Sequence, residues 1–248
     1  MTDACARISG YLNCEYEIFT NRKDEEALME RFYKLQEQGK KEGFSPLFII
    51  PDDTLAEAFE LFLEDNGQED SAAGMAAGRR EVIRQADALD AAELIRGRRE
   101  EYLEDQPEDA GLLGEFMAME PTTELTLRDI DDNVFPEIIL AKIPAGPPEL
   151  AAWAPMGGFN DCPSPAEQVA MFRYWQKKYG ATPAIVSYDV WQLTVERPPL
   201  SEAESEEAAW EHYAFCYDIV MQAPEEFASI RALASNLRGS TVWGFWWD

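Results

Sequence analysis

SPAEQVAMFRYWQKKYGATPAIVSYDVWQLTVE occupies residues 164–196, and its pattern predicts one helix followed by two strands. Ser164 suits the N-cap, Pro165 suits the first helical position, and Glu167 completes a capping box. Apolar side chains then recur at helical spacing as far as Gly180, a residue typical of helix ends. Residues 183–188 and 190–196 have strand composition, and the second segment alternates apolar with polar side chains, as a half-buried strand does.

Helix and strand patterns follow each other irregularly over the rest of the chain. The predicted helices cover residues 24–38, ended by Gly39 and Gly43, a segment capped by Asp53 or Thr54, residues 79–103 with a break near Asp90, and segments that begin at Ser201 and at Pro224, the latter with Phe227 facing inward. The other predicted strands are residues 46–50, 137–143 and 241–247. Because strict β-α-β alternation is absent, we predict an α+β fold with a mixed sheet and helices packed on it.

The distribution of charge and of predicted helices and strands divides the chain into two regions, which we expect to share one core. Residues 1–135 are helix-rich and acidic and contain one short strand, whereas residues 136–248 form an α+β region. Two segments are predicted to be mobile. Residues 101–120 place Pro107 among acidic side chains, and residues 66–78 are rich in alanine and glycine.

The charge of the chain restricts its partners. Asp and Glu number 48 against 21 Lys and Arg, which gives a net charge of −27. Such a surface repels phosphate backbones, which excludes ordinary nucleic-acid binding, and its field speeds association with basic proteins. No apolar run approaches the ~18 residues that a membrane-spanning helix needs. The four cysteines form no C-x-x-C pair and no export signal is visible, so we expect reduced thiols in the cytoplasm.

Standard catalytic motifs are missing from the sequence. It has no Gly-rich phosphate loop, no G-x-S-x-G elbow and no H-E-x-x-H. His212 is the only histidine, which excludes any site that needs two and removes the usual general base. His212 and Cys216 share a helix face and, with Cys162 and an aspartate, have the chemistry of a zinc site. Buried packing is the interpretation that we favour, and no metal or cofactor is predicted.

GGFNDCPSP, residues 157–165, is the densest polar turn of the chain. One hypothesis is a ligand loop at a helix N-terminus, where main-chain amides favour an anion. The other, which we favour, is a structural loop whose polar side chains cap the local backbone. The candidate ligand or interaction residues are Asn160, Asp161, Cys162, Arg173, His212, Cys216 and Asp218, and no residue is assigned a catalytic role.

The chain ends on VWGFWWD, residues 242–248. Strand alternation sends Trp243, Phe245 and Trp247 to one side and Trp246 to the other. Large aromatic side chains of this kind predict a C-terminal strand locked into the core rather than an exposed aromatic binding surface.

An ordered set of motifs runs through the C-terminal half: residues 157–163, Arg173, Trp175, residues 179–181, residues 197–199, Tyr213, Cys216, residues 218–220 and residues 243–248. Together these motifs resemble an uncharacterised bacterial family known as domain of unknown function 4253. Phe159 and Tyr217 depart from the family, which often has tryptophan and proline there. The resemblance implies a bacterial cytoplasmic protein and no particular activity.

Three classes of function are compatible with these features. The first is an acidic, non-enzymatic cytoplasmic protein that binds a basic protein partner, as an immunity protein against a basic toxin does. The second is an enzyme or small-ligand-binding protein that uses the loop of Asn160, Asp161 and Cys162 with His212 and Cys216. The third is a nucleic-acid mimic with ordered rows of carboxylates. The missing motifs and the net charge favour the first class, and whether the protein is an enzyme stays open at this point.

Overall fold

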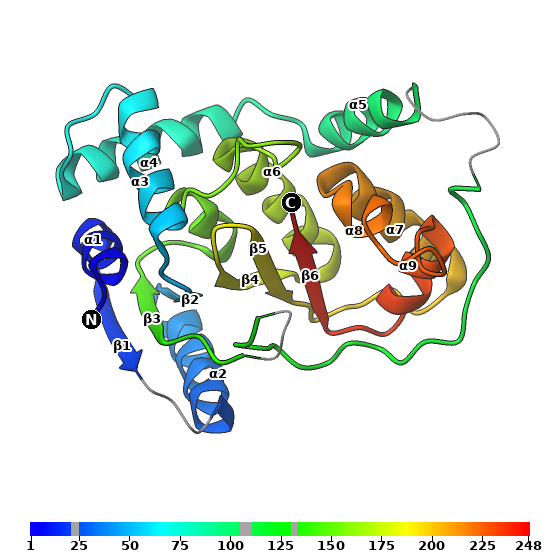
Figure 1. Cartoon of the computed structure of the whole chain (residues 1–248), viewed down its shortest axis with the longest axis horizontal. Helices are drawn as coiled ribbons and strands as arrows, with labels where there is room; N and C mark the ends of the chain where they lie inside the picture. Colours follow the sequence, from blue (N-terminus) through cyan, green and yellow to red (C-terminus); the bar gives the residue numbers. More distant parts are fainter. Residues whose placement is uncertain (21–24, 105–110, 130–132) are drawn as a thin grey trace.

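One six-stranded sheet organises the chain in the computed structural model, which describes residues 1–20, 25–104, 111–129 and 133–248 (Figure 1). The order across the sheet is β1-β3-β2-β4-β5-β6; β2 and β4 are parallel and the other neighbours antiparallel. The strands are β1 (Glu15–Thr20), β2 (Ser45–Ile49), β3 (Glu137–Ile143), β4 (Thr182–Val186), β5 (Val190–Thr194) and β6 (Val242–Trp246). The sheet is therefore mixed, and the predicted α+β class is confirmed.

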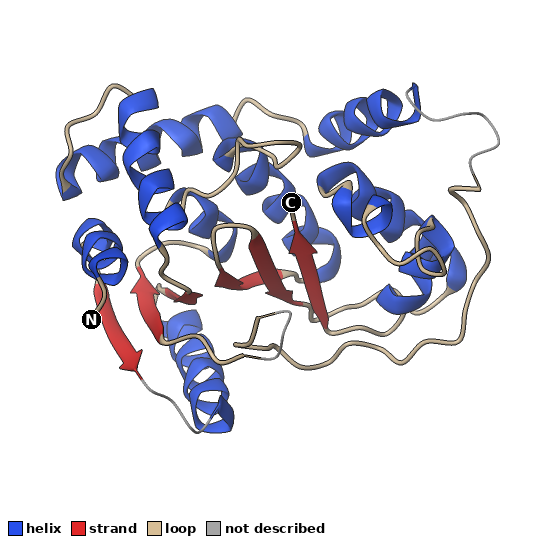
Figure 2. Cartoon of the chain, viewed as in Figure 1, coloured by secondary structure: helices blue, strands red, loops and turns tan. Residues whose placement is uncertain are grey.

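Helices cover both faces of this sheet (Figures 1 and 2). They are α1 (Asp3–Leu12), α2 (Glu25–Glu42), α3 (Asp53–Asp65), α4 (Ala72–Ala86), α5 (Ala91–Glu104), the 3₁₀ helix η1 (Pro147–Ala152), α6 (Pro165–Tyr179), α7 (Glu202–Phe215), α8 (Asp218–Met221) and α9 (Ile230–Leu237). Helix α2 packs on one face together with Leu125 and Leu127, and α1, α3, α4, α6 and α7 contribute to the larger core on the other face. No described helix is both long enough and apolar enough to cross a membrane.

Alternation along the strands divides the apolar side chains between the two cores. In β3, Ile139 and Ala141 enter the larger core while Ile138 and Leu140 enter the smaller one. The reason is that successive side chains of a strand point to opposite faces. Strand β3 lies between β1 and β2, so residues 1–135 and 136–248 contribute to the same sheet.

Local capping signals placed several helices correctly. Ser164 caps α6 in the predicted capping box with Glu167, and Gly180 ends it in the left-handed conformation with φ 68°. The predicted strand at residues 137–143 is also present. Helix α3 is capped by Asp52 instead of Asp53 or Thr54, because the Asp52 carboxylate accepts a hydrogen bond from the Leu55 amide at 2.7 Å.

Three predictions that were based on glycine or proline residues are wrong. Gly39 does not end α2; it lies inside the helix because a Cβ there would collide with the main-chain oxygen of Phe44. Residues 72–78 are helical, not mobile, since Ser71 caps α4. The last helix begins after Ser229 and not at Pro224, which leaves Phe227 exposed. In the other segment predicted to be mobile, residues 101–104 belong to α5, whereas residues 105–110 lie outside the described residues.

Candidate functional site

The loop of Asn160, Asp161 and Cys162 is fastened to the protein by the fully buried side chain of Gln168. The Gln168 Nε2 group donates hydrogen bonds to the main-chain oxygens of Met156 at 2.9 Å and Pro163 at 2.8 Å. Its Oε1 atom accepts a hydrogen bond from the Trp191 indole at 2.9 Å. One buried amide thus ties both ends of the loop to the central sheet, which is a structural use of the turn.

Gly157 is required by this arrangement. Its φ is +110°, and a Cβ would collide with the Pro163 oxygen and with Gln168 Nε2. We expect Gly157→Ala to lower the free energy of unfolding by about 2–3 kcal/mol, because backbone strain and overpacking add. Gly158 also has a positive φ but open space around it, so Gly158→Ala should cost only about 1 kcal/mol. Urea denaturation of the two variants tests this; equal losses would show that the collision is relieved.

Three of the predicted site residues meet at the end of β6. The Asn160 side-chain amide donates a hydrogen bond to the main-chain oxygen of Asp248. The Cys216 thiol donates to the Trp246 oxygen at 2.9 Å, and the Asp218 carboxylate accepts from the Asp248 amide at 3.0 Å. Burial raises the pKa of the Cys216 thiol to about 12. These side chains therefore hold the C-terminal residues in place by hydrogen bonds to their main chain. The raised pKa keeps the Cys216 thiol protonated, and a protonated thiol is a poor nucleophile.

Cys162 and His212 are also enclosed. Burial raises the pKa of the Cys162 thiol far above its usual range. His212 is 1% exposed, and the rings of Trp175, Trp243 and Phe245 surround it with centroid separations of 5.2, 4.5 and 4.7 Å. Burial lowers the pKa of the imidazole to about 3, so it is neutral at physiological pH. Both groups lack the solvent access that general acid–base catalysis needs, and the described residues supply neither with a catalytic partner.

Arg173 and Asp161 lie away from these buried groups. Arg173 forms ion pairs with Asp87 at 2.8 Å and Glu149 at 3.2 Å. Asp161 is exposed, and its main-chain oxygen accepts a hydrogen bond from Arg98 at 2.9 Å. Within the described ranges no group of three or more His, Cys, Asp or Glu side chains is placed to hold a metal ion. The zinc arrangement of Cys162, His212 and Cys216 is therefore not present.

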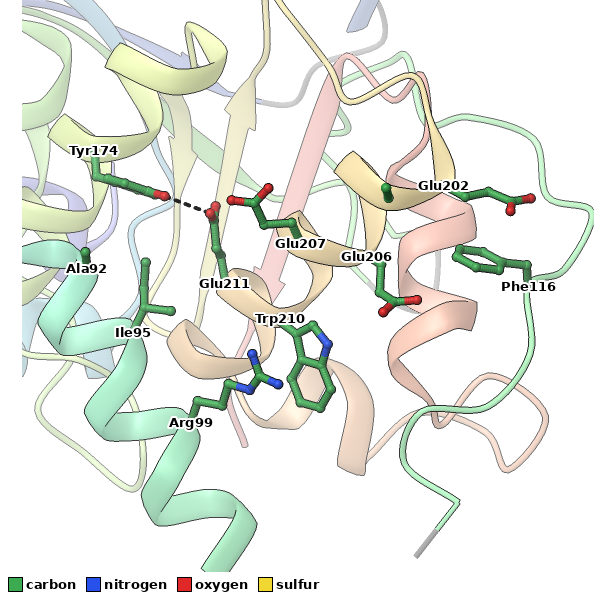
Figure 3. A pocket seen from close by; sticks show the side chains of 11 residues that line it. Ala92, Ile95, Arg99, Phe116, Tyr174, Glu202, Glu206, Glu207, Trp210 and Glu211 are labelled. Atoms are coloured by element: carbon green, nitrogen blue, oxygen red, sulfur yellow. Dashed lines mark hydrogen bonds between the residues drawn. The ribbon is translucent and has the colours of Figure 1, made fainter.

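A surface pocket of about 770 Å³ is lined by none of the seven predicted site residues. It lies between α5 and α7, with one side chain from α6 and one from the segment before β3 (Figure 3). Its lining residues are Ala92, Ile95, Arg99, Phe116, Tyr174, Glu202, Ala203, Glu206, Glu207, Trp210 and Glu211. Carboxylates and aromatic rings dominate this lining, and it is the candidate binding site.

The sequence of α7 explains how one helix supplies most of the pocket. Ser201 and Glu204 form a capping box that fixes the start of the helix. Glu202, Glu206 and Trp210 follow at intervals of four residues and so share one face, next to α5. None of these residues is among the seven predicted site residues, although the spacing of two acidic side chains and one aromatic side chain on one helix face is visible in the sequence.

Glu211 forms the inner wall of the pocket. Its side chain is only 5% exposed and accepts a hydrogen bond from Tyr174 Oη at 2.8 Å (Figure 3). It also accepts hydrogen bonds from Trp175 Nε1 at 3.0 Å and Lys178 Nζ at 2.6 Å. Although burial opposes the charge on Lys178, hydrogen bonds to Glu207 and Glu211 raise the pKa of its ammonium group. Hydrogen bonds therefore hold Glu207, Glu211 and Lys178 together along the inner wall of the pocket.

The outer carboxylates are positioned by cations of the same chain. Glu206 pairs with Arg231 at 2.8 Å, Glu207 pairs with Lys178 at 2.6 Å, and the Glu202 carboxylate lies 3.4 Å from Arg238. Each of these contacts uses one carboxylate oxygen, and Glu202 and Glu207 stay largely exposed. The pocket consequently offers ordered acceptor oxygens, which suits a ligand that donates hydrogen bonds and carries positive charge.

Comparison with known proteins finds a family for the C-terminal part of the chain. Residues 139–248 match the model of the family described as Domain of unknown function (DUF4253), and no curated protein and no solved structure matches the chain. The matched residues hold β3–β6 and the α7 wall of the pocket. The C-terminal part of this chain, residues 139–248, belongs to the domain family DUF4253, as its ordered motifs predicted.

Proposed function

We propose that this chain is a non-enzymatic binding protein of the bacterial cytoplasm that recognises a basic protein partner through the pocket between α5 and α7. The observation that carries the proposal is the presence of four glutamates from one helix, together with Trp210, around a single pocket. A net charge of −27 supports it, since a negative field accelerates encounter with a basic surface. A basic toxin held by an immunity protein is one such partner, and the four unpaired cysteines are consistent with the cytoplasm.

The alternative, an enzyme or small-ligand protein built on Asn160, Asp161, Cys162, His212 and Cys216, has less support. The two thiols have raised pKa values and the imidazole has a lowered one, the opposite of an activated cysteine–histidine pair. Fixed carboxylates in an open pocket instead favour binding, because the acceptors are ordered before the partner arrives.

Neutralising the exposed carboxylates of the pocket is expected to weaken partner binding about tenfold, the effect of losing two complementary charges. The variant is Glu202→Gln with Glu207→Gln. Its matched control is Glu57→Gln with Glu64→Gln, two exposed residues of α3 that change the net charge equally. Retention of a basic protein from the native host on the immobilised chain, followed by affinity measurement with the purified partner at low and high salt, is the test.

The proposal requires binding that falls with salt and that only the pocket variant weakens. Equal weakening by both variants would mean that net charge alone attracts basic proteins. Absence of any retained basic protein at low salt would also contradict the proposal.

A further inference from the structure

Arg99 differs from the other cations around the pocket. Its guanidinium carbon lies 3.8 Å from the centroid of the Trp210 ring, and both side chains are partly exposed (Figure 3). Lys178, Arg231 and Arg238 all pair with pocket carboxylates. Within the described part of the chain Arg99 makes no ion pair and no hydrogen bond, although the pocket contains four carboxylates. Stacking on the indole is the specific contact that holds it.

A second guanidinium of the chain meets the same combination of groups. Arg231 donates from Nε to Glu206 at 2.8 Å, and its guanidinium carbon lies 5.3 Å from the Phe116 ring. A carboxylate beside an aromatic face suits the planar guanidinium, which stacks and donates in a fixed fork, better than the compact ammonium of lysine. Arg231 is not part of the pocket lining, but it contacts two lining residues, so two guanidinium groups of the chain lie against aromatic rings of the pocket.

These contacts indicate which of the two guanidinium groups another cation could replace. Arg231 pairs with a carboxylate, whereas the five donors of Arg99 have no hydrogen-bond acceptor among the residues that the structure describes. An incoming arginine that stacks on Trp210 reproduces the contact that Arg99 gives up. Glu206 and Glu207 line the same pocket and present acceptor oxygens that Arg99 does not use.

We infer that the face of Trp210 is a docking platform for an arginine side chain of the basic partner, and that Arg99 occupies this platform in the free protein until the partner's arginine displaces it. This inference rests on the proposed function and makes it more specific. It predicts a preference for arginine over lysine at equal charge and a competition between the partner and Arg99.

The test uses two labelled synthetic peptides of equal length and charge, one containing arginine and glycine and the other lysine and glycine. Their binding to the full chain is measured by fluorescence anisotropy at fixed ionic strength. We expect the wild type to bind the arginine peptide about fivefold more tightly, Arg99→Ala to bind it a further ~fivefold more tightly, and Trp210→Leu to lose the preference.

Arg96→Ala is the matched control. Arg96 also lies on α5, pairs with Glu93 at 3.3 Å and does not line the pocket, so the variant removes the same charge without freeing the platform. A similar gain in Arg99→Ala and Arg96→Ala would overturn the inference, because charge alone would explain it. Weaker binding by Arg99→Ala would also overturn it, since Arg99 would then be part of the contact.

Equal binding of both peptides leaves the proposed function standing but removes the arginine platform, and no binding of either peptide contradicts the platform as well. Thermal melting of each variant confirms that it is folded.

Discussion

Trp247→Ala is expected to lower the free energy of unfolding by about 3–5 kcal/mol, the usual cost of truncating a fully buried large aromatic side chain. Trp247 is 1% exposed, and its ring packs against Phe215 and Phe245 with centroid separations of 5.4 and 6.2 Å. Its neighbour Trp246 points to the other side of the strand and is 38% exposed. Trp246→Ala removes a ring of the same size and one hydrogen bond, to Asp189 at 3.0 Å, and should cost only about 1 kcal/mol.

Equilibrium urea denaturation of the two alanine variants measures the difference between the buried and the exposed side of the chain at the end of β6. Trp247→Phe keeps most of the ring and removes an indole N–H that has no hydrogen-bond partner among the described residues. It should therefore lose far less stability than Trp247→Ala, and it serves as the measurable variant if Trp247→Ala does not fold. Equal destabilisation at positions 246 and 247 would contradict the placement of these side chains.

Elements with local signals were predictable from the sequence. The sequence of α6 itself determines where the helix begins and ends. Ser164 with Glu167 fixes the start and Gly180 the end, so no tertiary information is needed. Strand β6 was predictable because alternation decides which of its aromatic side chains are buried. The first half of α4, residues 72–78, was missed because its alanine and glycine content was taken to indicate a mobile segment, whereas the predicted helix at residues 79–103 covers the second half. Gly78 is required there because a Cβ would collide with the Phe62 ring.

The candidate pocket could not be predicted in the same way. Arg99 and Trp210 lie far apart in the sequence, and only the packing of α5 beside α7 brings them together. The conspicuous polar motif around Asn160 led instead to the end of β6, where its side chain contacts Asp248. The motif around Asn160 is therefore explained by its packing and hydrogen bonds. Buried hydrogen bonds restrict which residues fit at a position as strongly as a ligand does.

His212 gives the protein an acid-sensitive core. The folded pKa of about 3 lies below the ordinary value of 6.5, and burial is the cause. Between these two values the unfolded chain binds one more proton than the folded chain, so stability is fully present above pH 6.5 and is lost as pH falls towards 3. The expected loss is about 2–3 kcal/mol by pH 4.5 and on the order of 4 kcal/mol by pH 3.

Unfolding by urea between pH 7 and pH 4.5 isolates this effect. Glu81 and Glu137, whose pKa values are lowered to about 2 by their hydrogen bonds to Arg84 and Thr2, lose their stabilising contribution only below their ordinary value of 4.5. His212→Phe suits the surrounding rings and removes the titrating group together with the Nε2 atom that lacks a partner among the described residues. Its stability should change little over this range, whatever its value at pH 7. A variant that retains the wild-type slope would show that other groups bind the proton, and the imidazole would then be accessible or paired in the folded state.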